Sequence, residues 1–320
     1  MSLPEILRKN LTLPVIGAQL FIISNPDLVI EQCLSGVVGS FPALNARPQE
    51  VLEEWLTKIT RALNAARAAD PARRIAPFAV NQIIHTSNVR LGHDMEVCAK
   101  FKVPVIITSL SAPTAIVPTV HQWGGLVFHD VISVRHAKKA IDAGVDGLIL
   151  VCAGAGGHAG VQSPFALVQE VRKFWDGPIA LSGAITTGRA VLAAQAIGAD
   201  LAYVGTRFIA SHEANADARY KQMIVESDAA EIVYTPYFTG VAGNYLARSV
   251  TAAGFDIAAL PERDKTTMDF GSGSSKAKAW RDVWGAGQGV GTISDIAPAA
   301  EIIARMAREY AAARAELAAA

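Results

Sequence analysis

The chain has 320 residues, of which 51% are hydrophobic, and its 29 basic and 29 acidic residues cancel. This length allows one large α/β domain with a sizeable core and leaves room for a smaller companion. The balanced charge, without a Lys/Arg cluster interleaved with aromatic residues, argues against a nucleic-acid partner. The first residues lack the long apolar core of a signal sequence, and no run approaches about 18 apolar residues, so we expect a cytoplasmic protein without membrane contact.

Short apolar runs alternate with helical stretches over the first two thirds of the chain. The expected strands are residues 14–18, 36–41, 77–83, 103–110, 125–131, 147–153, 178–184 and 201–208. The helices expected between them are residues 26–34, 49–69, 88–100, 112–123, 133–143, 164–175 and 188–197. Eight strands alternating with helices predict a (β/α)8 TIM barrel, whereas the alternative, a doubly wound sheet, more often has fewer strands.

The alternation stops after Phe208. Residues 211–284 contain a helical stretch at 216–226 and then scattered aromatic, glycine and proline residues, with a flexible Gly-Ser-Gly-Ser-Ser segment at 271–275. We expect a smaller, mostly helical domain at 211–284 that caps the mouth of a barrel formed by residues 1–210 and 285–320. The alanine-rich stretch 296–317 predicts a last helix that either closes the barrel or faces a partner. The second alternative would allow the protein to form a homo-oligomer.

A glycine-rich stretch around the sixth expected strand carries the strongest functional signal. Residues 148–151 have the continuous apolar character of a strand buried on both faces. Four glycines and one histidine follow this strand: Gly154, Gly156, Gly157, His158 and Gly160. The glycines allow a flat ligand to approach the main chain, and histidine is an acid or base near neutral pH. A plain turn with a surface histidine is the alternative, but ligands gather at the C-terminal ends of such strands.

Three other strand ends offer ligand contacts. Asn81 ends the third strand, Ser182, Gly183 and Ala184 end the seventh, and a Gly-Thr-Arg sequence at 205–207 ends the eighth. The seventh and eighth βα loops of TIM barrels commonly bind phosphate through backbone N–H groups. We therefore predict a phosphate site at these two loops.

The three cysteines, Cys33, Cys98 and Cys152, are widely spaced and form no Cys-x-x-Cys pair. This pattern indicates neither a disulfide framework nor a zinc site, so we expect small core residues and no metal.

Three motifs, in this order, resemble the nitronate monooxygenase family, formerly called 2-nitropropane dioxygenases: Ala155-Gly-Gly-His-Ala-Gly160, Leu181-Ser-Gly-Ala184 and Val204-Gly-Thr-Arg-Phe208. The superfamily also includes FMN-dependent enoyl-acyl-carrier-protein reductases. The resemblance implies an FMN at the C-terminal mouth of the barrel and His158 as the catalytic histidine. The residues that it implies as cofactor contacts are Gly17, Ala18, Gln19, Asn81, Gly156, Gly157, Ser182, Gly183, Ala184, Val204, Gly205 and Thr206.

The activity implied by this resemblance is oxidation of an alkyl nitronate, or of a nitroalkane, by O2 to a carbonyl compound and nitrite. The alternative is an FMN-dependent NAD(P)H reductase of an enoyl thioester or quinone, and a third hypothesis is a barrel that binds a ligand without turnover. The chain departs from many relatives, which have Gln-Gly-Gly after the first strand, a lysine near His129 and Asp130, and a second glycine at Ala184. These departures leave the substrate open, and His129 is either a second acid or base or a satisfied histidine.

Four aromatic residues of the 211–284 region are candidates for the substrate pocket, and the alternative is that they form the core of their own domain. They are Tyr234, Tyr237, Phe238 and Tyr245.

Overall fold

The computed structural model describes residues 3–260 and 282–319. Eight parallel strands form one sheet in the order β1-β9-β8-β6-β5-β4-β3-β2, and a bridge between Ile16 and Val38 joins β1 to β2. The strands are β1 (Val15–Gly17), β2 (Gly39–Pro42), β3 (Phe78–Ile84), β4 (Val105–Leu110), β5 (Leu126–Val131), β6 (Gly147–Val151), β8 (Ile179–Ser182) and β9 (Leu201–Val204). The predicted TIM barrel is confirmed, with a strand in each of the eight expected runs.

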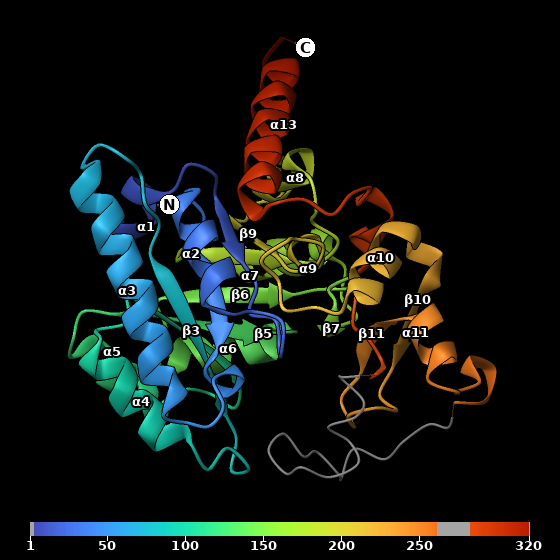
Figure 1. The fold of residues 1–320 in the computed structure, drawn as a ribbon, viewed down its shortest axis with the longest axis horizontal. Helices are drawn as coiled ribbons and strands as arrows, with labels where there is room; N and C mark the ends of the chain where they lie inside the picture. Colours follow the sequence, from blue (N-terminus) through green and yellow to red (C-terminus); the bar gives the residue numbers. More distant parts are fainter. Residues whose placement is uncertain (1–2, 261–281, 320) are drawn as a thin grey trace.

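Helices follow most strands and surround the sheet (Figure 1). They are α1 (Glu5–Asn10), α2 (Pro26–Leu34), α3 (Val51–Ala69), α4 (Leu91–Lys100), α5 (Ile116–His121), α6 (Val134–Asp142), α7 (Pro164–Arg172), α8 (Gly188–Ala196), α9 (Thr206–Ile209) and α13 (Ala299–Ala319). Side chains at Asn25, Ser133 and Thr187 accept hydrogen bonds from the first turns of α2, α6 and α8, which satisfies backbone donors at those helix starts. The expected eighth strand is shorter than predicted, because α9 begins at Thr206.

Two apolar layers hold the barrel together. One layer lies between strands and helices, and the other fills the barrel interior with residues such as Ile107, Phe128 and Ile149. Leu7 of α1 and Leu11 belong to the interior layer as well. Successive residues of each strand alternate between the two layers, and this alternation decides which side chains reach the mouth.

The region after β9 contains a β-hairpin in addition to helices. It comprises α10 (Ala218–Glu226), β10 (Ile232–Thr235), β11 (Gly243–Leu246) and α11 (Ala247–Ala252), and the Gly-Ser segment at 271–275 lies outside the described residues. The hairpin pairs antiparallel with β7 (Gly157–His158), so that Gly243 opposes His158. The expectation of mostly helical structure missed these strands, because four-residue strands carry little periodicity and their third partner is a distant loop. The proposed domain boundaries stay a prediction.

The contact between α8 and α13 yields a stability prediction. A Cβ at Gly188 would overlap the Met306 carbonyl oxygen and the Tyr310 nitrogen, which are backbone atoms of α13. Gly188→Ala should therefore lower the free energy of unfolding by about 1–3 kcal/mol, measured by urea denaturation. Gly92→Ala on α4 is the control, because a Cβ there meets nothing within 4 Å; equal stabilities of the two variants would contradict the close helix contact.

Candidate active site

A cavity of about 850 Å³ opens at the C-terminal ends of the barrel strands. Side chains and backbone from the loops after β1, β6, β8 and β9 line it, together with residues from the segment after β9. The structure brings together eleven of the thirteen predicted site residues here: Ala18, Gln19, Asn81, Gly156, Gly157, His158, Ser182, Gly183, Ala184, Gly205 and Thr206.

The other two predicted residues, Gly17 and Val204, do not line this cavity. A Cβ at Gly17 would overlap the end of the Gln32 side chain of α2, so glycine leaves room for that side chain. Val204 is fully buried in the layer between strands and helices. Their direct contact with a cofactor stays a prediction from family resemblance, and the structure gives each a packing role.

The glycine loop after β6 lies directly against the loop at residues 285–289. Gln288 N donates to the Gly154 carbonyl oxygen over 2.9 Å. A Cβ at Gly156 would lie 2.8 Å from Gly287 N, and a Cβ at Gly287 would lie 2.5 Å from Gly154 O. The two glycines therefore permit a close backbone contact that fixes the wall of the cavity.

The loops after β8 and β9 present little side-chain bulk to the cavity. Gly183 has φ +140°, and a Cβ there would lie 2.7 Å from the Ala153 carbonyl oxygen. Ala184 has φ 54°, a conformation that favours glycine, so the departure noted at this position carries a backbone cost. Thr206 Oγ1 accepts a hydrogen bond from Gly287 N over 2.9 Å, which ties α9 to the glycine-loop contact.

His158 lies in β7 and faces the cavity with a defined partner. Its Nε2 is 2.8 Å from Thr239 Oγ1, and the Thr239 hydroxyl donates to the Val241 carbonyl oxygen over 3.0 Å. Because the hydroxyl has only one hydrogen, we infer that the ring hydrogen lies on Nε2 and the lone pair on Nδ1. Burial lowers the pKa of His158 to about 4, so the imidazole is neutral at pH 7.

His129 does not belong to this site. It alternates outward from β5, is buried, and its Nδ1 lies 2.8 Å from Thr108 Oγ1. Burial lowers its pKa to about 4. This geometry agrees with the satisfied-histidine interpretation, whereas its neighbour Asp130 faces inward and lines the cavity.

A chain of polar side chains crosses the barrel beneath the cavity. Asn81 Nδ2 donates to Ser109 Oγ over 2.8 Å, and Ser109 Oγ donates to Asp130 Oδ2 over 2.6 Å. Gln19 Nε2 donates to the same carboxylate oxygen over 3.2 Å. Gln19 follows β1, and Asp130 lies near the end of β5, which is on the opposite side of the barrel. Ser109 was missed by the sequence analysis, although its place at the end of an expected strand was a usable signal.

Two oxygens of this polar floor are unsatisfied. Asp130 Oδ1 and Gln19 Oε1 are buried without a hydrogen-bond partner among the described residues. Burial raises the pKa of Asp130 to about 6, against the hydrogen bonds from Ser109 and Gln19, which lower it. The floor is therefore suited to a ligand with hydrogen-bond donors, since an unpaired buried acceptor is costly.

The raised pKa of Asp130 predicts a pH-dependent stability. Between the unfolded and the folded pKa of Asp130, the native state binds more protons than the unfolded state. The contribution of Asp130 to the free energy of unfolding is therefore most favourable in acid and is lost as pH rises through about 6. Asp130→Asn should therefore stabilise the cofactor-free protein by about 1–3 kcal/mol at pH 7.5 and by much less at pH 4.5. Urea unfolding at both pH values measures this difference, and an equal effect at both would contradict it.

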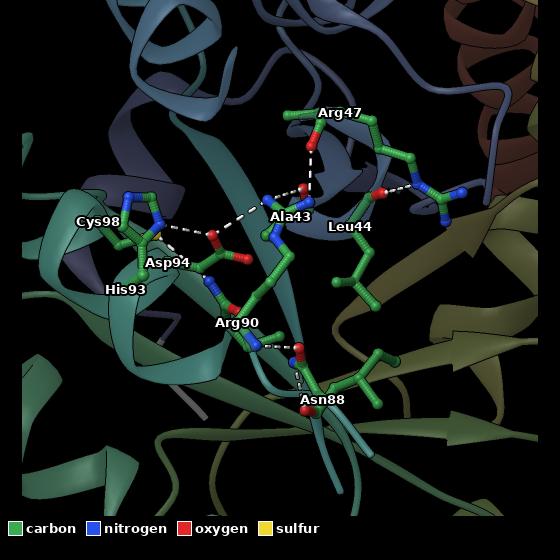
Figure 2. A network of polar contacts seen from close by, with 11 residues as sticks. Ala43, Leu44, Arg47, Asn88, Arg90, His93, Asp94 and Cys98 are labelled. Atoms are coloured by element: carbon green, nitrogen blue, oxygen red, sulfur yellow. Dashed lines mark hydrogen bonds and ion pairs between the residues drawn. The ribbon is translucent and has the colours of Figure 1, made fainter. Parts of the chain in front are cut away.

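A polar network behind the cavity holds the loop that follows β2. Arg90 Nη1 donates to the Ala46 carbonyl oxygen over 2.7 Å, and Arg90 Nη2 lies 3.1 Å from Asp94 Oδ1 (Figure 2). Arg47 Nε in turn donates to the Leu44 carbonyl oxygen over 2.8 Å. Leu44 and Arg47 line the cavity, so α4 fixes part of its wall, a role that the sequence did not indicate.

Of the four candidate aromatic residues, Phe238 lines the cavity. Its ring packs against Tyr245 and Tyr237, which lie in a core of their own segment. Tyr234 is partly exposed and donates to the Ala159 carbonyl oxygen over 3.0 Å. Tyr220 and Trp284 also line the cavity, with stacked rings 4.9 Å apart, and were not among the candidates.

The described residues contain no group of three or more His, Cys, Asp or Glu side chains that could hold a metal ion, and all three cysteines are buried and unbridged. No helix within residues 3–260 and 282–319 is long and apolar enough to cross a membrane.

Comparison with known proteins decides the family. The sequence profile named nitronate monooxygenase matches residues 54–309, most of the chain. The chain belongs to the nitronate monooxygenase family. A nitronate monooxygenase of Paraburkholderia phytofirmans is 25% identical, with 92% of each chain covered. The protein is accordingly a flavin-dependent oxidoreductase of a family that acts on small molecules and O2.

Relatives of this nitronate monooxygenase family member carry more than one activity. A Rhodococcus jostii octahydro-indene-carboxyl-CoA dehydrogenase is 26% identical over 62% of this chain and 53% of its own length. Among solved structures, the fold is similar to FabK from Thermotoga maritima, with TM-score 0.78, 23% identity and coverage of 98% and 97%. It is also similar to nitroalkane oxidase from Streptomyces ansochromogenes, with TM-score 0.80, 21% identity and coverage of 98% and 100%.

Proposed function

We propose that the protein is an FMN-dependent nitronate monooxygenase that oxidises alkyl nitronates with O2 to carbonyl compounds and nitrite. The observation that carries this proposal is a neutral, partly buried His158 in one cavity with two strand-end loops that have small side chains. The cavity volume of about 850 Å³ is within the usual range for cofactor and ligand sites.

The described residues fit an FMN. Gly183, Gly205 and Thr206 are suited to hold its phosphate, because they leave main-chain groups accessible at the βα loops where this fold binds phosphate. Gln19 Oε1 and Asp130 Oδ1 are unsatisfied acceptors that suit the donor groups of a flavin. When bound, FMN supplies electron transfer from the substrate to O2.

The protein's own groups bind and orient the substrate. Nε2 of His158 is held by Thr239, so the lone pair that a base requires lies on Nδ1. This atom is suited to remove the α-proton from a neutral nitroalkane. For a nitronate, which has already lost that proton, no base is needed, and because Thr239 holds the single ring hydrogen of neutral His158, we propose that His158 only helps to position the substrate.

Anaerobic mixing tests this function. The FMN-loaded enzyme is mixed with propyl-2-nitronate or with NAD(P)H while the flavin absorbance is recorded. Rapid bleaching by the nitronate alone supports the proposal. Bleaching by NAD(P)H alone would favour the second candidate function, a reductase of an enoyl thioester or quinone. The similarity to a CoA-thioester dehydrogenase supports this second candidate.

The cofactor itself is a prediction. The purified protein should be yellow and release FMN on heating, because the cavity combines one pair of phosphate-type loops without a second nucleotide-binding fold in the described chain. Chromatography of the released cofactor identifies it. FAD in place of FMN would contradict the assignment of these loops.

A further inference from the structure

Large apolar side chains stand exposed around the mouth of the cavity. Ile22, Leu110 and Ile132 are 40%, 39% and 43% exposed, and all three line it. Ile22 and Ile132 belong to the loops after β1 and β5, and Leu110 is the last residue of β4. The hydrogen bond between Gln19 and Asp130 joins the loop after β1 to the end of β5 across the barrel, so Ile22 and Ile132 flank the same opening. Clustered exposed apolar groups of this kind mark binding surfaces.

Two of these residues have a strained backbone. Ile22 has φ 69° and Leu110 has φ 79°, in the left-handed region. For a β-branched residue such as Ile22 this conformation is a genuine outlier. Strain of this kind persists where the surrounding structure enforces it, and it concentrates at ligand sites.

Two asparagines enforce the conformation of Ile22. Asn45 Oδ1 accepts from Ile22 N over 2.9 Å, and Asn215 Nδ2 donates to the Ile22 carbonyl oxygen over 3.1 Å. Asn45 Nδ2 also donates to the carbonyl oxygens of Leu20 and Ser24, each over 2.9 Å. These hydrogen bonds hold the backbone on both sides of Ile22. They keep the apolar side chain of Ile22 at the mouth of the cavity, although this side chain is partly exposed to solvent.

The apolar surface continues inward from this rim. The residues that extend it along the cavity wall are Leu20, Phe21, Ile23, Leu44 and Ile83. A two- or three-carbon nitronate has little apolar surface to bury against such a wall. The wall is instead suited to an unbranched hydrocarbon chain, since each buried methylene adds to binding.

We propose that the outer part of the cavity is an aliphatic subsite, so that the enzyme prefers nitronates with an unbranched chain of several carbons over the shortest ones. This inference rests on the proposed function for the reacting group, whereas the apolar subsite itself is independent of the reaction. The charged end of the substrate would face His158, and its chain would extend toward Ile22 and Ile132.

A binding series tests the subsite without turnover. Straight-chain carboxylates from acetate to octanoate are planar two-oxygen anions like nitronates but are not oxidised here. Their Kd for the FMN-loaded enzyme is measured from the perturbed flavin absorbance. We expect Kd to fall by about twofold to fourfold for each added methylene, the upper value being that of full burial. A Kd independent of chain length would overturn the proposal.

Variants locate the subsite. Ile22→Gly removes the apolar group, and glycine adopts φ 69° without strain, so the fold should be kept. It should reduce the acetate-to-octanoate ratio of Kd values several-fold, whereas an unchanged ratio would remove Ile22 from the subsite. Phe165→Ala is the control, because Phe165 is 61% exposed on α7 and does not line the cavity.

The same ligand lengths separate the subsite from the reaction. If carboxylate affinity rises with chain length but no nitronate of any length bleaches the flavin, the subsite stands and the nitronate function fails. If nitronates of all lengths are oxidised with equal kcat/KM and the Kd of the carboxylates does not change with chain length, the nitronate function stands and the subsite is wrong.

Discussion

Replacing His158 with alanine should lower kcat/KM for a neutral nitroalkane by about 10² to 10⁴, the loss typical of a missing general base. The phosphate-type loops at Gly183 and Gly205 are separate from His158, so FMN should stay bound. A pre-formed nitronate should lose much less, because its α-proton is already gone. Both values are measured on FMN-replete protein at the same pH.

The pKa of His158 adds a second readout. Because burial lowers this pKa to about 4, the unprotonated base is present throughout pH 5.5 to 8, and the nitroalkane kcat/KM should not fall in that range through His158. His121→Ala is a matched control, since His121 lies on α5, contacts Asp146 and does not line the cavity. Equal, large losses with both substrate forms would assign His158 to positioning or electron transfer, and no loss would remove it from the mechanism.

Gly183→Asp should reduce FMN affinity by about 100-fold or more. Gly183 has φ +140°, and a side chain would meet the Ala153 carbonyl oxygen, so the loop must shift. The carboxylate also adds a negative charge beside the proposed phosphate site, where like-charge repulsion is large at close range. Fluorescence titration of the cofactor-free protein with FMN measures the affinity, and circular dichroism checks that the variant is folded.

Gly183→Ala separates the two causes. It carries the same backbone strain and the same close contact without the charge, so its FMN affinity should fall between those of the wild type and Gly183→Asp. If the two variants bind FMN equally, the loss is steric. If a folded Gly183→Asp binds FMN as well as the wild type does, Gly183 is not part of the phosphate site.

The sequence by itself determined the barrel and the position of its site. Strands buried on both faces, such as 147–151, are continuous apolar runs, and this pattern is local enough to be recognised without the fold. Because parallel strands end at the same edge, motifs that follow different strands must meet there. For this reason the sequence alone places His158, Gly183 and Gly205 together, and all three line one cavity.

Only the tertiary structure decided which side chains face the cavity. Adjacent residues of a strand point to opposite sides, so His129 and Asp130 could not be told apart until the phase of β5 was fixed by packing. The pairing of β7 with β11 and the hydrogen bond from Gln19 to Asp130 join residues more than 80 positions apart, which no local pattern encodes. The left-handed conformation of Ile22 likewise depends on distant asparagines, and local propensity would exclude it.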